Sequence, residues 1–138
     1  MTDTIAFPGG VELRHIRIAR PTRRLDDVVR FYRDVLGLPV IDSFRDHAGY
    51  EGVMLGLPGT RYHLEFTSRE ADAADPVPHG DDLLVLYCAD ERSFTALAQQ
   101  VSQAGASPVA PENPYWSDKG LTLEDPDGRR IVICRPLE

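Results

Sequence analysis

Two stretches of the chain share one pattern of apolar and polar residues. Residues 52–67 begin with an apolar run that ends at Pro58, and they continue as the alternating segment YHLEFT. Residues 120–135 begin in the same way, end their first run at Pro126, and continue as the apolar segment IVIC. In both stretches the first glycine lies six residues before the proline. Two strand-like segments around a Pro/Gly turn predict a β-hairpin, and the recurrence indicates an internal repeat.

The first half of the chain adds a strand and a helix before its hairpin. Residues 11–19 alternate well enough to predict a strand. The positions that would share one face of this strand are Leu13, His15 and Arg17. Apolar residues spaced three and four apart over 25–36 predict an amphipathic helix that ends before Gly37. Residues 39–44 predict a further strand.

The second half repeats this order after residues 69–82, an acidic segment rich in alanine and proline that predicts a linker. The apolar run LLVLYC predicts a buried strand over 83–88. Asp90 is a suitable cap for a helix that ends at Gly105. The remaining expected elements are a strand over 108–110, a loop over 111–119 and the second hairpin.

The length and charge of the chain narrow the class of protein. A chain of 138 residues can bury a sizeable core as one domain over 1–138, with modules at about 11–68 and 83–136. The net charge of −7 disfavours nucleic acid, and no apolar run approaches the roughly 20 residues that span a bilayer. The N-terminal residues lack the pattern of a secretion signal, so the sequence predicts a cytoplasmic location. Cys88 and Cys134 stand apart and are expected to be reduced.

Three segments resemble the vicinal oxygen chelate superfamily, the group of glyoxalases, bleomycin-resistance proteins and extradiol dioxygenases. They are HIRIARPTRRLDDVVRFYRDVLGL, YHLEF and DPDGRRIVI. The resemblance implies an α+β fold of two βαβββ modules, whose strands form an open, curled mixed sheet around a pocket. It also implies a homodimer. Within the superfamily the chain is similar to small, poorly characterised bacterial members.

The resemblance further implies where a divalent metal would be held, with about one ligand from each of four strands. His15 and Glu65 fall on two of these positions. The repeat places Leu83 at the position of His15, and Val132 or Ile133 at the position of Glu65. Apolar side chains cannot coordinate a metal, and most catalytic sites need three protein ligands. We therefore expect a metal-free member without a cofactor.

Strand alternation indicates which side chains face the pocket. On the first strand His15 and Arg17 would face it, and in YHLEFT so would His63 and Glu65. The residues of that segment expected to face the helix are Tyr62, Leu64 and Phe66. Convergent polar side chains are typical of a binding site, although a histidine with a carboxylate partner is also common as a structural pair. The candidates from the second half are Tyr115 and Trp116 for ligand binding, and Tyr87 for apolar lining.

Three functions remain open. The first is a small-molecule-binding protein, with or without lyase or isomerase activity on a small carbonyl compound. His15 or Glu65 would then act as a general acid or base. The second is a non-catalytic sequestering protein for a cationic drug or metabolite, in keeping with the acidic charge. The third is a metal-dependent lyase or dioxygenase with an irregular set of ligands, and the fold does not decide among them because one fold serves many chemistries.

Overall fold

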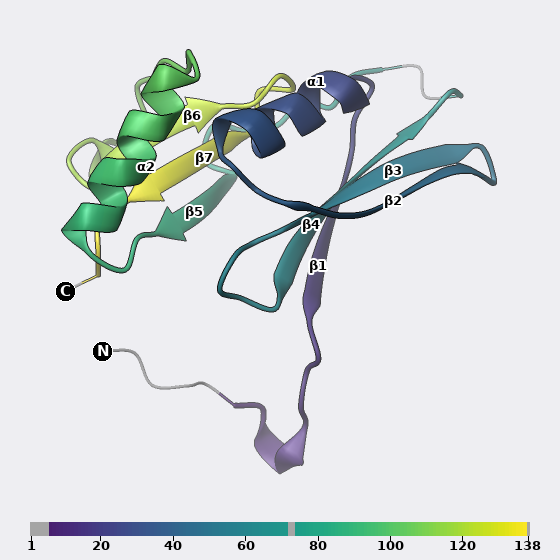
Figure 1. Cartoon of the computed structure of the whole chain (residues 1–138), viewed down its shortest axis with the longest axis horizontal. Helices are drawn as coiled ribbons and strands as arrows, with labels where there is room; N and C mark the ends of the chain where they lie inside the picture. Colours follow the sequence, from purple (N-terminus) through teal and green to yellow (C-terminus); the bar gives the residue numbers. More distant parts are fainter. Residues whose placement is uncertain (1–5, 72–73, 138) are drawn as a thin grey trace.

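Two β-sheets, one from each half of the chain, form the framework of the molecule (Figure 1). This computed structural model describes residues 6–71 and 74–137. The first sheet has the order β1-β4-β3-β2 and consists of β1 (Ile16–Pro21), β2 (Val40–His47), β3 (Tyr50–Gly56) and β4 (Tyr62–Arg69). The second sheet has the order β5-β7-β6 and consists of β5 (Leu83–Tyr87), β6 (Gly120–Glu124) and β7 (Arg130–Cys134). In each sheet the first strand of the half pairs in parallel with the last.

One helix follows the first strand of each half, as predicted. α1 (Leu25–Arg30) continues as a π-helical turn (Phe31–Val35). α2 (Glu91–Gln103) begins after Asp90, whose carboxylate accepts a hydrogen bond from the Ser93 amide at 2.7 Å. The remaining helical elements are two 3₁₀ turns, Pro8–Gly10 and Pro114–Trp116. No helix within the described ranges is long and apolar enough to cross a membrane.

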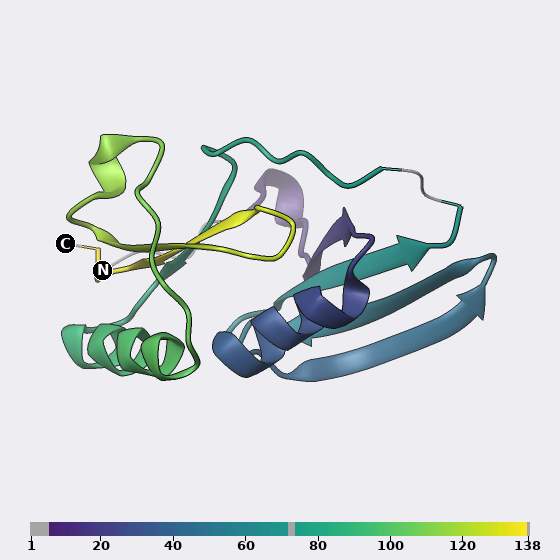
Figure 2. The same cartoon turned by 90° about the horizontal axis from the view of Figure 1, so that it is seen from above.

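Both helices lie on the same side of the molecule, α1 against the first sheet and α2 against the second (Figure 2). Their inner faces and the covered faces of the sheets meet in one apolar core. Its largest members from the first half are Tyr32, Leu55, Leu64 and Phe66, and those from the second half are Phe94, Leu123, Ile131 and Ile133. Because a single core contains residues from both halves, each half stabilises the other.

A buried hydrogen bond joins the two halves across this core. The hydroxyl of Tyr32, on the π-helical turn, donates to Oδ2 of Asp125 at 2.7 Å, although the two residues are 93 positions apart. The other carboxylate oxygen of Asp125 accepts hydrogen bonds from the backbone amides of Asp127 and Arg129, which closes the turn between β6 and β7. Burial raises the pKa of Asp125, and it also raises the pKa of Tyr32, so the phenol keeps its proton and acts as the donor.

The α+β class and the order of the elements are confirmed, and three details differ from expectation. β1 begins at Ile16 and not at residue 11, because Ile16 lies opposite Tyr62, the first residue of β4, and the described residues before Ile16 have no partner in the sheet. The strand expected over 108–110 is reduced to a single bridge with β6. The arrangement is open, as expected, but its strands form two separate sheets within the chain and not one curled sheet.

The hydrogen-bond register fixes which residues of the two halves are equivalent. The amide of Thr22 donates to the carbonyl of Thr67 at 2.8 Å, and the amide of Cys88 donates to the carbonyl of Cys134 at 2.9 Å. These bonds stand at the same place in each module, where the first strand leaves the last. α2 has 13 residues, whereas α1 and its π-helical turn have 6 and 5. The number of residues between a position in the first half and its equivalent in the second half is therefore different before and after the helices.

This register corrects one equivalence that the sequence predicted. His15 lies seven residues before Thr22, and Asp81 lies seven residues before Cys88. The counterpart of His15 is therefore Asp81 and not Leu83. Glu65 lies two residues before Thr67, and Val132 lies two residues before Cys134. The counterpart of Glu65 is therefore Val132 and not Ile133. The equivalence at Leu83 was wrong because the spacing was measured through helices of unequal length.

Candidate ligand-binding site

The face of the first sheet that α1 leaves uncovered carries a group of mainly polar side chains. Arg17 of β1 lies opposite His63 of β4. Met54 of β3 lies opposite Glu65 of β4 and, on its other side, opposite Asp42 of β2. Side chains that are directly opposite one another in a sheet point to the same face. We call the surface formed by these five residues the open face.

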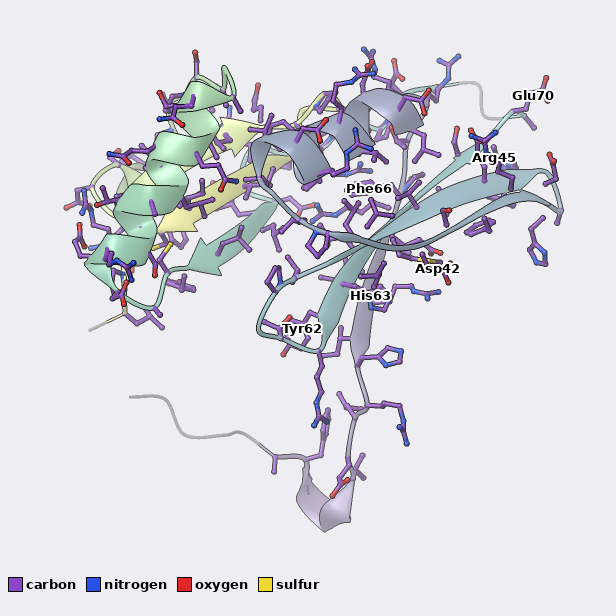
Figure 3. The ribbon with its side chains drawn as sticks, viewed as in Figure 1. Asp42, Arg45, Tyr62, His63, Phe66 and Glu70 are labelled. Atoms are coloured by element: carbon purple, nitrogen blue, oxygen red, sulfur yellow. The ribbon has the colours of Figure 1, made fainter. Side chains whose placement is uncertain are left out.

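The two faces of β4 are sharply divided. Figure 3 shows Phe66 beneath α1 and His63 on the side of the sheet away from the helix. Leu64 and Phe66 are fully buried in the core, which confirms the orientation predicted from strand alternation. Tyr62 is the exception, because at the first position of β4 it stays 48% exposed and borders the cavity instead of packing under the helix.

A chain of polar contacts crosses the open face from β4 to β1. The Nε atom of Arg17 donates a hydrogen bond to Nε2 of His63 at 2.9 Å. A terminal nitrogen of the same guanidinium lies 3.7 Å from a carboxylate oxygen of Glu65. His63 and Glu65 are only 8% and 9% exposed, whereas the side chain of Arg17 is 48% exposed. Arg17 therefore compensates the buried carboxylate and presents the rest of its guanidinium to the solvent side of the sheet.

The contact with Arg17 fixes the protonation form of His63. Because Nε2 accepts a hydrogen bond, the imidazole is neutral and carries its proton on Nδ1. His15, one residue before β1, is exposed, and its ring centroid lies 5.5 Å from that of His63. The open face thus holds two imidazoles side by side, one of them with a defined tautomer.

A cavity of about 550 Å³ lies beside these residues. Its polar lining comes from His15, Arg17, Asp42, Arg61 and His63, and its apolar lining comes mainly from Ile41, Met54, Leu57 and Tyr62. Glu65 is absent from this lining and reaches the cavity only through Arg17. The size and the mixture of apolar walls with a few polar groups are typical of a site for a small organic molecule.

The structure brings together four of the six residues predicted to bind a ligand, His15, Arg17, His63 and Glu65. Tyr115 and Trp116 lie instead at a second cavity, on the three-stranded sheet, together with Tyr87. Asp42 and Arg61 line the first cavity but were not among the candidates. Asp42 follows a register shift between Val40 and Asp42, which breaks the alternation that would reveal its orientation.

The donors implied for a metal do not form a site within the described ranges. Those ranges contain no group of three or more His, Cys, Asp or Glu side chains that could hold a metal ion. Val132, the counterpart of Glu65, is apolar, and Asp81, the counterpart of His15, is an exposed residue before β5. Most catalytic metal sites need three protein ligands, and the three remaining donors, His15, Glu65 and Asp81, do not come together as such a group in the described part of the chain.

Solved structures of other proteins share this fold. A glyoxalase/bleomycin resistance protein/dioxygenase domain from Frankia sp. EAN1pec aligns with a TM-score of 0.66 and 19% identity, covering 93% of each chain. TnmS3, an antibiotic binding protein from Streptomyces sp. CB03234, aligns with a TM-score of 0.64 and 17% identity, covering 93% of this chain and 98% of that one. The fold is that of the vicinal oxygen chelate superfamily, as the sequence resemblance implied.

The sequence narrows this class to one family. Residues 16–67 match the YycE-like N-terminal domain, and residues 81–135 match the YycE-like C-terminal domain. The uncharacterised protein YycE of Bacillus subtilis is 51% identical over 118 residues, which is 86% of this chain and 85% of that protein. The crystal structure of a YycE protein of unknown function from Bacillus subtilis aligns with a TM-score of 0.78 and 49% identity, covering 89% of this chain and 88% of that one. The chain therefore belongs to the YycE-like family.

Proposed function

We propose that this protein binds a small polar or ionised organic molecule at the open face of its first sheet. One observation carries the proposal. A nearly buried carboxylate, a guanidinium and a neutral imidazole form a continuous chain on a sheet face without a covering helix, directly beside a cavity of about 550 Å³. Burying such groups is costly and contributes little to stability. Their arrangement is better explained by the recognition of a ligand.

The lining indicates how the ligand is held. Its apolar part packs against Ile41 and Met54 on the neighbouring strands. Its polar part accepts hydrogen bonds from the guanidinium of Arg17 and from the imidazoles of His15 and His63. TnmS3, which shares the fold, is an antibiotic binding protein, so the same architecture supports small-molecule binding in at least one relative.

Thermal-shift screening tests this proposal. A panel of small carboxylates, phosphonates, carbonyl compounds and drugs should contain a ligand that raises the melting temperature in a concentration-dependent way, because a ligand that binds only the folded state stabilises it. A hit whose effect disappears when Arg17 is replaced supports the site. If every stabilising ligand keeps its full effect on that variant, the open face is not where it binds.

We further propose that binding at the open face uses no metal. Protein purified without chelators is expected to contain no stoichiometric zinc, iron, nickel or manganese by elemental analysis, because the described part of the chain supplies too few donors in one place. Addition of these ions should leave the melting temperature unchanged. One equivalent of bound metal that is lost together with His15 or Glu65 would contradict this proposal.

A second candidate function is acid/base catalysis on a small carbonyl compound. It is favoured by the pairing of an exposed imidazole, His15, with the neutral imidazole of His63 at one cavity. His15 would remove a proton from the carbon beside the carbonyl group, and the Nδ1–H of His63 would donate to the carbonyl oxygen. Proton NMR in D₂O is expected to show enzyme-dependent exchange of that hydrogen, and His15→Ala should abolish it. A bound carbonyl ligand whose hydrogen does not exchange would leave binding as the sole function.

The expected homodimer and cytoplasmic location stay predictions from the sequence.

A further inference from the structure

A second cavity, of about 390 Å³, lies at the end of the three-stranded sheet, and the proposed function does not use it. Its floor is the end of β7 at Cys134, and its wall is the 3₁₀ turn Pro114–Trp116. Burial raises the pKa of the Cys134 thiol, so this residue is a small apolar floor and not an activated nucleophile.

The sheet register explains why a hollow forms here. Cys134 lies opposite Tyr87 of β5 on one side and opposite Gly120 of β6 on the other. A large ring therefore stands beside the small side chain of Cys134, whereas Gly120 adds no space, because the backbone of Ile133 and Cys134 occupies the place where its side chain would be. The turn above them is held in place, because the side chain of Asn113 accepts a hydrogen bond from the Tyr115 amide at 3.0 Å. One border of the space is thus fixed by a hydrogen-bonded turn.

Aromatic rings surround this space and are poorly covered by the chain itself. Tyr115 and Trp116 make an edge-to-face contact with ring centroids 5.0 Å apart. Tyr87 and Tyr115 both remain largely exposed. A planar ring inserted beside them would bury these surfaces and gain the stacking energy that such pairs provide.

The charge around the cavity favours an anion, although the whole chain carries −7. The ammonium of Lys119 lies 4.9 Å from the ring centroid of Tyr115. Its carboxylate neighbour, Asp118, is 4.0 Å away and 85% exposed, so this pair is weak. Arg135 adds a second positive charge to the lining, in contact with Glu91 and over the ring of Phe94. Because Asp118 also lines the cavity and Glu91 already pairs with Arg135, the positive charge offered to a ligand is mainly the weakly paired ammonium of Lys119, which a carboxylate would complement.

We propose that this second cavity binds an aromatic carboxylate. Its ring packs among Tyr87, Tyr115 and Trp116, and its carboxylate pairs with the ammonium of Lys119. The cavity is a separate site from the open face, since the two share no lining residue.

The experiment uses the intrinsic fluorescence of Trp116, which is the single tryptophan of the chain and lines the cavity. Benzoate should change this fluorescence in a saturable way. Cyclohexanecarboxylate, which has the same charge but no aromatic face, should bind several-fold more weakly. Lys119→Gln is expected to raise the dissociation constant of benzoate about 10-fold or more, because a hydrogen bond between charged groups is lost. Arg23→Gln removes an exposed positive charge remote from the cavity lining and should leave it unchanged.

Four outcomes would overturn the proposal. They are the absence of saturable binding by benzoate, equal or tighter binding of benzyltrimethylammonium, equal binding of cyclohexanecarboxylate, and unchanged affinity in a folded Lys119→Gln variant. Arg17→Ala provides the test of independence, since it alters the open face alone. If this substitution weakens benzoate binding as much as Lys119→Gln does, the two cavities act as one composite site and the proposal of a separate site fails.

Discussion

Replacing Tyr32 by alanine is expected to lower the free energy of unfolding by about 3–5 kcal/mol, the usual range for removing a buried aromatic side chain. Tyr32 is fully buried and its ring centroid lies 4.7 Å from that of Phe66. The substitution also deletes the hydroxyl that bonds to Asp125 in the other half of the chain. Such a loss is a large part of the stability of an ordinary domain. Urea denaturation followed by circular dichroism measures it.

Tyr32→Phe is the matched control, because it keeps the ring and removes only the hydroxyl. It should cost about 1–3 kcal/mol, since a buried carboxylate then lacks one of its donors. Equal losses for the two variants would mean that the ring contributes nothing beyond the hydrogen bond. A loss below about 1 kcal/mol for the alanine variant would show that the core tolerates the cavity, against expectation.

The cost of Tyr32→Phe should depend on pH. Burial raises the pKa of Asp125, and the hydrogen bond from Tyr32 opposes this rise. Without the hydroxyl, the folded state holds the Asp125 proton to a higher pH, while the unfolded state still releases it near its ordinary value of about 3.9. The folded state of the variant then binds more protons, so its stability falls as the pH rises through this window. The difference from the unmodified protein should therefore be smaller near pH 4 than at pH 7.

Replacing Arg17 by alanine should weaken binding at the open face about 10- to 100-fold, the effect expected when a charged hydrogen-bond donor is removed from a polar site. The substitution deletes the donor to His63 and leaves Glu65, which is 9% exposed, without its cation. Isothermal titration with a ligand from the thermal-shift screen measures the change.

Two further variants separate the parts of this effect. Glu65→Gln removes the buried negative charge but leaves Arg17 in the cavity, so a smaller loss is expected. Arg61→Ala removes a positive charge from the same cavity without disturbing the polar contacts among the buried groups, and should change affinity least. If Arg61→Ala costs as much as Arg17→Ala, general positive charge holds the ligand and the specific arrangement does not.

Much of the fold could be predicted because its signals are local. The hairpins, the two helices and the cap at Asp90 each follow from patterns within a few residues. Alternation also placed His63 and Glu65 on the face opposite Leu64 and Phe66, and this division is what creates the open face. The candidate site could be predicted to that extent.

The remaining features depend on contacts between distant parts of the chain. The bond from Tyr32 to Asp125 joins two positions whose approach no local pattern indicates. The register shift beside Asp42 hides that residue from any analysis based on alternation. Tyr115 and Trp116 were expected beside His15, but the separation of the two sheets places them at a cavity of their own.

The shared core also determines what should happen when the chain is cut between its two halves. Residues 74–82 run between β4 and β5 without a helix or strand of their own. A polypeptide cut there would yield an N-terminal and a C-terminal fragment, each with an apolar surface that normally contacts the other. Neither fragment is expected to fold alone, but mixing them should restore the native spectrum, as complementary fragments of an interdependent fold do.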